Sequence, residues 1–305
     1  MLFTIAIPTY NNEKSILQTI ESCLNQVYKN EYEILIVNNA STDKTLEVIT
    51  NVALYNLKIK IINNKKTVSL FENHNICLKN SNGDYILFCH ADDELSENAL
   101  EILEEKIKYR KYPPKYILWG QSLFRDYFFS IDKEKIGYNT IFAGERAKKL
   151  FSSPSGLTPS GTCYSRKSII ELGGFNKMKT RITPSDWTIM LKAAINSFEF
   201  EMLDRIIFYR KFASTNNENI KFREAIFAIV DAFNILKSDL NETEVKEIKK
   251  NLYENSNLNN YFLLKYCFSE KVNIFKYIGF LIKKDGFLKI GMFIVNLMRF
   301  YSENK

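Results

Sequence analysis

Short apolar runs alternate with helix-spaced apolar residues along the first hundred residues, and no other feature constrains the fold as strongly. The runs predict four strands, over 2–7, 33–37, 58–62 and 85–89. The spacing between them predicts helices over 16–27 and 46–53, and a further helix that begins near Ser96. Strands and helices that alternate in this way predict an α/β fold with a mostly parallel sheet and right-handed crossovers.

Two polar turns follow predicted strands, at residues 38–43 and 90–94. Ligands of parallel sheets bind in the crevice outside the carboxyl ends of the strands, so we expect both turns to line one crevice. The second turn carries Asp92 and Asp93 directly after an apolar strand. Adjacent carboxylates suit a divalent cation that also binds substrate phosphates, and they equally suit a solvated turn that caps the next helix.

The rest of the chain is organised differently. The segment from roughly 110 to 165 shows little periodicity and contains Pro113-Pro114 and a stretch rich in serine, proline and glycine at 152–161. So many turn formers predict a loop that shapes or covers a site. Regular structure is expected to resume at Asp186, and helices are expected from about residue 217 onward. These changes divide the chain into an α/β domain over 1–217 and a helical C-terminal region over 218–305.

Composition excludes several kinds of protein. Five scattered cysteines argue against a disulfide framework and a zinc site, and favour a reducing compartment. Because the chain contains two histidines, a metal site that needs several histidine ligands is excluded. The N-terminal run is broken by Pro8 and predicts a strand, not a signal peptide. No run approaches the ~20 uncharged apolar residues of a spanning helix, so a soluble or peripheral protein is expected.

The net charge of +7 is concentrated near the C-terminus. Residues 271–305 contain seven basic and two acidic residues, which gives +5, and these charges are interleaved with aromatic and aliphatic residues. This pattern is typical of an interfacial anchor on anionic lipid, and it also suits a helical cap on the first domain or a dimer contact. It does not favour a nucleic-acid partner, because such a binder would gather its basic charge around a recognition element.

Five motifs occur in a fixed order along residues 3–215. They are Ile-Ala-Ile-Pro-Thr-Tyr-Asn-Asn at 5–12, Glu-Ile-Leu-Ile-Val-Asn-Asn-Ala-Ser-Thr-Asp-Lys-Thr at 33–45, Asn75 with Gly83-Asp84-Tyr85-Ile86, His90-Ala91-Asp92-Asp93, and Leu172-Gly173-Gly174-Phe175 followed by Ser185-Asp186-Trp187. In this order the chain resembles the inverting, family 2 glycosyltransferases that build bacterial surface polysaccharides. The resemblance implies the GT-A fold, a Rossmann-like, mixed and mostly parallel sheet flanked by helices. The helices expected after residue 217 would follow it as a C-terminal extension.

The resemblance also implies where a nucleotide-sugar donor binds. It places Pro8, Thr9, Tyr10 and Asn11 in the nucleotide-binding loop, although the same residues fit a simple strand-ending turn. Asn39 stands where the family usually has an aspartate that bonds the uracil base. An asparagine keeps an acceptor and adds a donor, so base preference could change, and an Asx-turn is the alternative role.

For the metal, the resemblance implies that Asp92 or Asp93 binds a divalent ion, Mn²⁺ or Mg²⁺, at the donor diphosphate, with the other carboxylate near the ribose. The ion would neutralise charge on the leaving UDP. His90 occupies the first position of the motif, where an aspartate is commoner. A neutral imidazole there could bond the ribose or the diphosphate, or could simply fill space.

Asp186 is the candidate general base of the inverting transfer, because one carboxylate must take the proton of the acceptor hydroxyl. Its alternative role is a helix N-cap. Ser185 stands where the family often has a second acidic residue. Thr162 is a candidate contact for the donor sugar or the acceptor. Arg210 is a candidate contact for the diphosphate or, alternatively, part of a solvated basic pair.

Together these features predict a metal-dependent, inverting hexosyltransferase that uses a UDP-hexose or UDP-N-acetylhexosamine. The expected acceptor is a hydroxyl of a growing, lipid-linked surface glycan such as O-antigen, capsule or lipooligosaccharide, reached at the cytoplasmic face of the membrane. The Gln-x-x-Arg-Trp motif of processive synthases is absent, which predicts the addition of one sugar per encounter. Two alternatives are a degenerate, scaffold-like transferase and a nucleotidyltransferase, although the loop after the first strand lacks the glycines of the latter.

Overall fold

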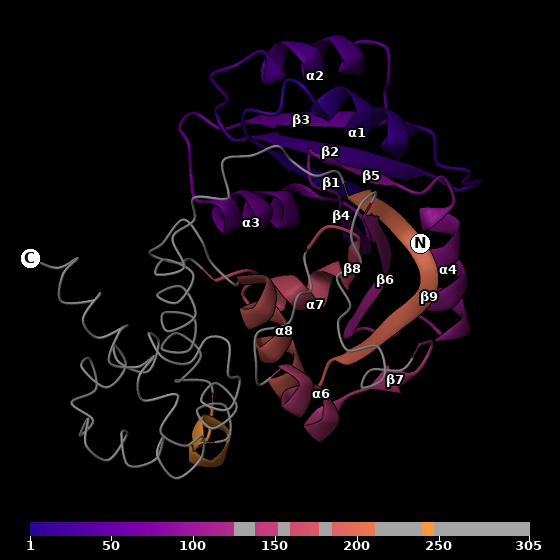
Figure 1. Cartoon of the computed structure of the whole chain (residues 1–305), viewed down its shortest axis with the longest axis vertical. Helices are drawn as coiled ribbons and strands as arrows, with labels where there is room; N and C mark the ends of the chain where they lie inside the picture. Colours follow the sequence, from indigo (N-terminus) through magenta and orange to yellow (C-terminus); the bar gives the residue numbers. More distant parts are fainter. Residues whose placement is uncertain (125–137, 152–158, 177–184, 211–239, 247–305) are drawn as a thin grey trace, which may run out of the picture.

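A computed structural model describes residues 1–124, 138–151, 159–176, 185–210 and 240–246. Its centre is a mixed sheet of nine strands in the order β3-β2-β1-β4-β8-β6-β9-β5, with β7 paired to β9 (Figure 1). The sheet and its flanking helices confirm the predicted fold class of a mixed, mostly parallel α/β domain.

The first part of the chain forms the parallel half of the sheet. Its strands and helices are β1 (Phe3–Thr9), α1 (Ile16–Leu24), β2 (Tyr32–Asn38), α2 (Thr45–Ala53), β3 (Ile59–Asn63), α3 (Leu70–Asn80) and β4 (Tyr85–Phe88). β1 pairs in parallel with β2 on one side and with β4 on the other. The carboxyl ends of the three strands therefore meet at one edge, as the alternating pattern predicted.

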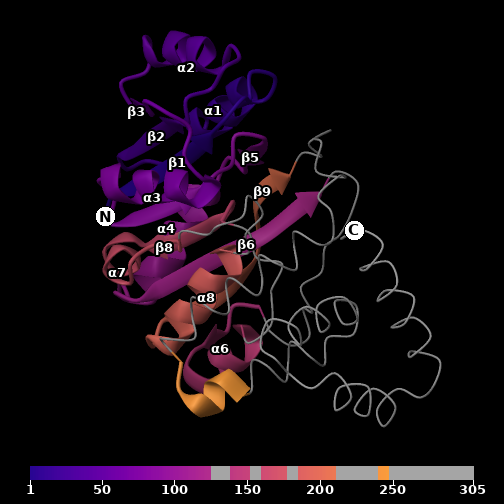
Figure 2. The same ribbon diagram turned by 90° about the vertical axis from the view of Figure 1, so that its left-hand side faces the viewer.

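The second part adds the parallel pair of β6 and β9, together with three strands that run antiparallel to their neighbours, β5, β7 and β8. Its strands and helices are β5 (Asp93–Leu95), α4 (Ala99–Tyr109), β6 (Tyr116–Phe124), β7 (Ile141–Phe142), α6 (Gly144–Phe151), β8 (Thr162–Ser165), α7 (Arg166–Glu171), α8 (Ser185–Ile195) and β9 (Glu199–Arg210). β8 is antiparallel to both β4 and β6. The long β9 curves from β7 to β5 and so returns to the edge where the parallel strands end (Figures 1 and 2).

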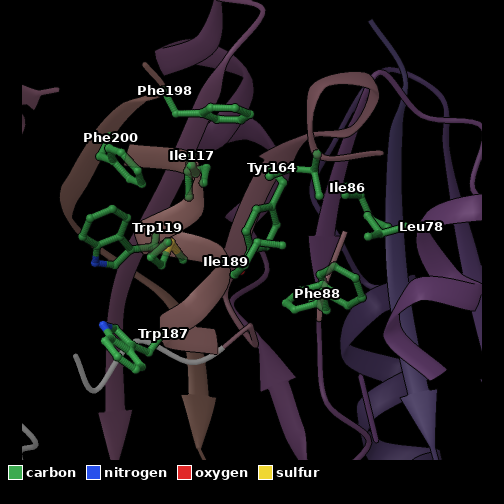
Figure 3. Packing of buried hydrophobic residues seen from close by; sticks show 14 of the residues in the cluster. Leu78, Ile86, Phe88, Ile117, Trp119, Tyr164, Trp187, Ile189, Phe198 and Phe200 are labelled. Carbon is green, nitrogen blue, oxygen red and sulfur yellow. The ribbon is translucent and has the colours of Figure 1, made fainter. Parts of the chain in front are cut away.

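Apolar side chains on the two faces of the sheet form two separate cores, because successive residues of a strand point to opposite faces. On one face, Ile5 and Ile7 of β1 pack with residues of α1, α2 and α4. On the other face, Ala6 packs with residues of α3, α6, α7 and α8. In this second core Trp187 and Ile189 of α8 lie against Trp119 and Tyr164 of the sheet (Figure 3).

The four predicted strands and the predicted helices over the first hundred residues are present, with bounds that differ by a few residues. Helix α3 was not predicted, because its buried face includes polar Asn73 and His74 and so lacks a continuous apolar stripe. The segment 110–165 is also more regular than expected. It contains the central strands β6 and β8, and the pairing of β6 with β9 is irregular between Trp119 and Ser122, which obscures the alternation.

The expected C-terminal helices fall largely outside the described residues, as does the basic segment 271–305. Beyond Arg210 the structure describes residues 240–246, of which 242–246 are helical. None of the described helices has the length and the apolar character needed to cross a membrane. Cys23, Cys77, Cys89 and Cys163 are free and buried.

Candidate functional site

The loops that follow β1 and β2 are bonded to each other at the carboxyl edge of the sheet. The backbone N–H of Asn11 donates to Ser41 Oγ at 3.0 Å, and its side-chain Oδ1 accepts the N–H of Thr42 at 2.8 Å. Asn11 has φ of 53°, in the left-handed region that asparagine tolerates better than most residues. Of the residues expected to bind the nucleotide, Pro8 and Thr9 are buried, whereas Tyr10 and Asn11 are exposed beside the edge.

Asn39 is buried in a network of its own at the end of β2. Its Oδ1 accepts the N–H of Val68 at 2.9 Å and an N–H of Asn64 at 3.0 Å, and its Nδ2 donates to the Val68 carbonyl at 2.9 Å. The amide thus ties the segment around Val68 to the sheet. Its Nδ2 carries a second hydrogen that none of these bonds uses, and base binding by Asn39 stays a prediction.

The segment from His90 to Asp93 forms a tight turn between β4 and β5, closed by a bond from the Asp93 N–H to the His90 carbonyl at 3.0 Å. Helix α1 holds this turn in place, because Thr19 Oγ1 donates a hydrogen bond to the Asp93 carbonyl at 2.8 Å. Asp93 is only 3% exposed. Asp93 is therefore not part of a solvated turn, and the alternative that the two carboxylates form such a turn is wrong for Asp93.

His90, Asp92 and Asp93 together form a candidate metal site. Their potential ligand atoms all lie within 4.8 Å of one another. Each ligand of a divalent ion lies about 2.0–2.6 Å from the ion, so two ligands of the same ion are at most about twice that distance apart. The separations among these three side chains are therefore compatible with one bound ion. Burial raises the pKa of Asp92 above its usual range, which a bound cation would reverse.

Arg210 supplies positive charge beside these carboxylates. It ends β9 and is paired in register with Asp93 of β5. The Arg210 charge acts on Asp92, on Asp186 and on His90, where it adds to burial in lowering the histidine's pKa to about 4. Arg210 therefore lies in the same charged cluster as the candidate metal ligands and the candidate base.

Asp186 lies in the first turn of α8, and its Oδ1 accepts the backbone N–H of Trp187 at 2.9 Å. Trp187 anchors this turn in the core, where its indole N–H donates to the Phe151 carbonyl at 2.7 Å (Figure 3). Burial raises the pKa of Asp186 to about 7, although the backbone bonds and Arg210 act in the opposite direction. A carboxylate with a pKa near neutrality is suited to accept a proton at neutral pH.

A pair of hydrogen bonds connects the segment before α8 to α3. Asn75 Nδ2 donates to the Phe175 carbonyl at 2.7 Å, and Asn75 Oδ1 accepts the Phe175 N–H at 2.8 Å. A side chain at position 174 would collide with this amide, since a Cβ on Gly174 would overlap Asn75 Oδ1. The motif that contains Asn75 and the motif that contains Gly174 and Phe175 are therefore hydrogen-bonded to each other, although they lie far apart along the chain.

Thr162 begins β8 beside the end of β4 and is buried. The neighbouring Ser160 accepts the His90 N–H through its Oγ at 3.1 Å, and the Gly161 N–H donates to the Phe88 carbonyl at 2.9 Å. Gly161 has φ of +74° and its position leaves no room for a Cβ beside the Phe208 ring. These bonds place Thr162 close to the turn that contains His90, and its contact with donor or acceptor stays a prediction.

Of the two histidines of the chain, His74 was not predicted to contribute to the site. His74 is fully buried in α3, and its Nε2 lies 3.1 Å from Nε2 of His90. Burial is the main cause that lowers the pKa of His74 to about 3. No motif connected the two positions, because the contact depends on α3 packing beneath the end of β4.

Comparison with known proteins identifies relatives of one enzyme class. Residues 4–173 match the family model described as glycosyl transferase family 2. The chain is 38% identical over 99 residues to the putative glycosyltransferase EpsE of Bacillus subtilis, and 32% identical over 109 residues to the poly(ribitol-phosphate) β-N-acetylglucosaminyltransferase TarS of Staphylococcus aureus. These matches cover 32% and 33% of the chain, but only 35% of EpsE and 18% of TarS.

Solved structures extend the likeness over more of the chain. Residues 1–349 of S. aureus TarS in complex with UDP-GlcNAc match with a TM-score of 0.67 at 19% identity, covering 86% of this chain and 75% of that one. A mannosyltransferase of Pyrobaculum calidifontis, in complex with GDP-Man and Mn²⁺, matches with a TM-score of 0.62 at 15% identity, covering 97% and 84%. At these identities the structural likeness establishes the fold alone.

Proposed function

Because the chain belongs to glycosyl transferase family 2, we propose that it transfers a single sugar from a UDP-hexose or UDP-N-acetylhexosamine to a hydroxyl of a bacterial surface glycan, with inversion. One observation carries this proposal. Arg210 is paired in register with Asp93, and its charge acts on the candidate metal ligand Asp92 and on the candidate base Asp186, at the edge of the sheet where ligands of such folds bind.

In the proposed reaction, Asp186 accepts the proton of the acceptor hydroxyl as that oxygen attacks the anomeric carbon from the face opposite the diphosphate. Its raised pKa favours this role, and the Trp187 anchor holds the carboxylate in place. Arg210 stabilises the negative charge of the diphosphate. When bound by His90, Asp92 and Asp93, Mn²⁺ or Mg²⁺ would supply further neutralisation of the leaving group.

Two observations support the donor class. One structural neighbour is bound to UDP-GlcNAc, and another is bound to GDP-Man with Mn²⁺, so the shared fold accommodates nucleotide sugars with a divalent ion. The family match also favours a sugar transfer over the nucleotidyl transfer that the sequence left open. A degenerate, scaffold-like transferase is the alternative, and it would bind the donor without turning it over.

Donor turnover tests the proposal without knowledge of the acceptor. Water can replace the acceptor slowly, and ¹H NMR distinguishes the two anomers of the released sugar before they equilibrate. With an α-linked UDP sugar and Mn²⁺, we expect release of UDP and the first appearance of the β anomer. Early appearance of the α anomer would contradict inversion. Release of pyrophosphate from UTP and a sugar 1-phosphate, together with no release of UDP from the UDP sugar, would identify a nucleotidyltransferase.

We further propose that the acceptor is lipid-linked and that residues 271–305 bring the enzyme to an anionic membrane surface, as a peripheral protein on the cytoplasmic side. The sequence of this segment supports the idea, since lysines interrupt its aromatic and aliphatic residues and its net charge is +5. The domain boundary near residue 217 belongs to the same proposal, with the catalytic site in 1–217 and the membrane contact in 218–305.

Flotation on phosphatidylserine-containing vesicles tests the membrane contact. Reversal of Lys283, Lys284 and Lys289 to glutamate should weaken binding by at least 100-fold, because each lysine near an anionic surface contributes about 1 kcal/mol. Reversal of Lys29 and Lys111, which are exposed on the catalytic domain, should have little effect. Equal flotation of the wild type and the triple variant would contradict the proposal.

A further inference from the structure

The two histidines of the chain lie in contact although they come from different elements. His74 belongs to α3 and His90 to the turn after β4, and their Nε2 atoms are 3.1 Å apart. The rings meet edge to face, with centroids 5.3 Å apart and an interplanar angle of 89°. One hydrogen must lie between the two nitrogens, so one ring donates and the other accepts.

A backbone carbonyl decides which ring donates. His74 Nδ1 lies 2.8 Å from the Leu70 carbonyl oxygen, which can only accept, so Nδ1 of His74 carries a hydrogen. The His74 ring is fully buried and is surrounded by the rings of Phe71, Phe88 and Phe175, an environment that disfavours a charged imidazole. In a neutral His74, Nε2 is then an acceptor, and the shared hydrogen belongs to Nε2 of His90.

This assignment leaves a lone pair on Nδ1 of His90. A ring nitrogen of His90 and the carboxylates of Asp92 and Asp93 lie within 4.8 Å of one another, and Nε2 is already bonded to His74. We propose that His74 is a positioning residue that fixes His90 as its Nε2–H tautomer, so that Nδ1 serves as the third protein ligand of the divalent ion. This inference rests on the metal-dependent reaction proposed above.

The nature of the third ligand has a consequence for the choice of metal. Mg²⁺ prefers oxygen ligands, whereas an imidazole nitrogen is a better ligand for transition metals. A site with one nitrogen and two carboxylates should therefore favour Mn²⁺ over Mg²⁺. The variant His90→Asp restores an all-oxygen set and should reduce this preference.

The first experiment determines the tautomers directly. With ¹⁵N-labelled histidine, long-range ¹H–¹⁵N NMR of the full chain shows two ring patterns, because the sequence has two histidines, and His74→Phe assigns them. We expect the hydrogen on Nδ1 in His74 and on Nε2 in His90. A hydrogen on Nδ1 of His90, or a charged His74 ring, would overturn the proposal.

The second experiment measures Mn²⁺ affinity by calorimetry in the absence of donor. His74→Phe fills the aromatic site but removes the acceptor, and should weaken Mn²⁺ binding about 10- to 100-fold, as loss of a partner behind a ligand typically does. His74→Gln places an amide oxygen near the position of Nε2 and should restore most of the affinity. Cys77→Ala, a change at another buried position of the same helix, is the matched control and should leave the affinity unchanged.

The outcomes separate this proposal from the proposed function. Equal Mn²⁺ affinity in the wild type and in His74→Phe would overturn the positioning role and leave the sugar transfer untouched. A wild type that binds UDP sugars but no Mn²⁺ would overturn the assignment of His90 as a ligand and would remove the metal from the proposed reaction. A shift of the His90 Nδ1 resonance on addition of Mg²⁺, or its selective broadening by Mn²⁺, would support both.

Discussion

Replacing Asp186 with asparagine is expected to reduce sugar transfer by about 10²- to 10⁴-fold, the usual contribution of a positioned general base. Asparagine has nearly the same shape as aspartate and can still accept the Trp187 N–H through its amide oxygen, so α8 should begin as it does in the wild type. The amide cannot take a proton from the acceptor. Donor affinity should therefore stay within a few-fold of wild type while the rate of UDP release falls.

The matched control is Asp204→Asn, an exposed aspartate of β9, which should leave the rate unchanged. The pH profile gives a second readout of the same residue. Because the pKa of Asp186 is raised to about 7 and the base acts in its ionised form, wild-type activity should rise with pH through about 7 and level off above it. Near-normal turnover by Asp186→Asn, or a wild-type rate that does not fall below pH 7, would show that another group is the base.

The second large effect is expected from loss of the metal ligands. The double variant Asp92→Asn, Asp93→Asn removes two negative charges from the cluster that also contains His90 and Arg210. Without them the site should no longer hold Mn²⁺, and transfer should fall about 10³-fold, because several kcal/mol of charge stabilisation on the leaving UDP are lost. Treatment of the wild type with EDTA should have the same effect, reversed by Mn²⁺.

Glu94→Gln is the appropriate control, since it removes a charge from the next residue of β5, which is not among the three clustered side chains. Its activity and its response to Mn²⁺ should match the wild type. Full activity of the wild type in EDTA would mean that Arg210 and the surrounding backbone stabilise the leaving group without a metal.

The sequence predicted the parallel half of the sheet because its strands are short and largely apolar and its helices have clear apolar faces. Helix α3 was missed for a physical reason. Its buried Asn73 donates to the Val37 carbonyl and its buried His74 bonds the Leu70 carbonyl, so polar side chains occupy positions where periodicity looks for apolar ones. Tertiary hydrogen bonds of this kind leave no periodic signal.

The sequence motifs pointed to individual residues of the candidate site but not to the contacts between them. The motifs located Asp92, Asp93 and Asp186, and the topology of β9 then brings Arg210 to them. The contact between His74 and His90 depends on the packing of α3 against β4, which no spacing in the sequence encodes. The bonds between the Asn39 amide and Val68 were likewise not predicted, and the binding of the nucleotide base by Asn39 stays a prediction.

The most direct test of the central claim, that the site around Asp92 and Asp93 binds a UDP sugar through a divalent ion, is a thermal-shift panel. UDP, GDP, CMP and dTDP sugars are compared with Mn²⁺ present and again in EDTA. Ligand at 100 times its Kd stabilises a protein by about 2.7 kcal/mol, so we expect UDP sugars alone to raise Tm by about 5 °C with Mn²⁺ and by much less in EDTA. No shift with any of these donors, or an equal shift in EDTA, would contradict it.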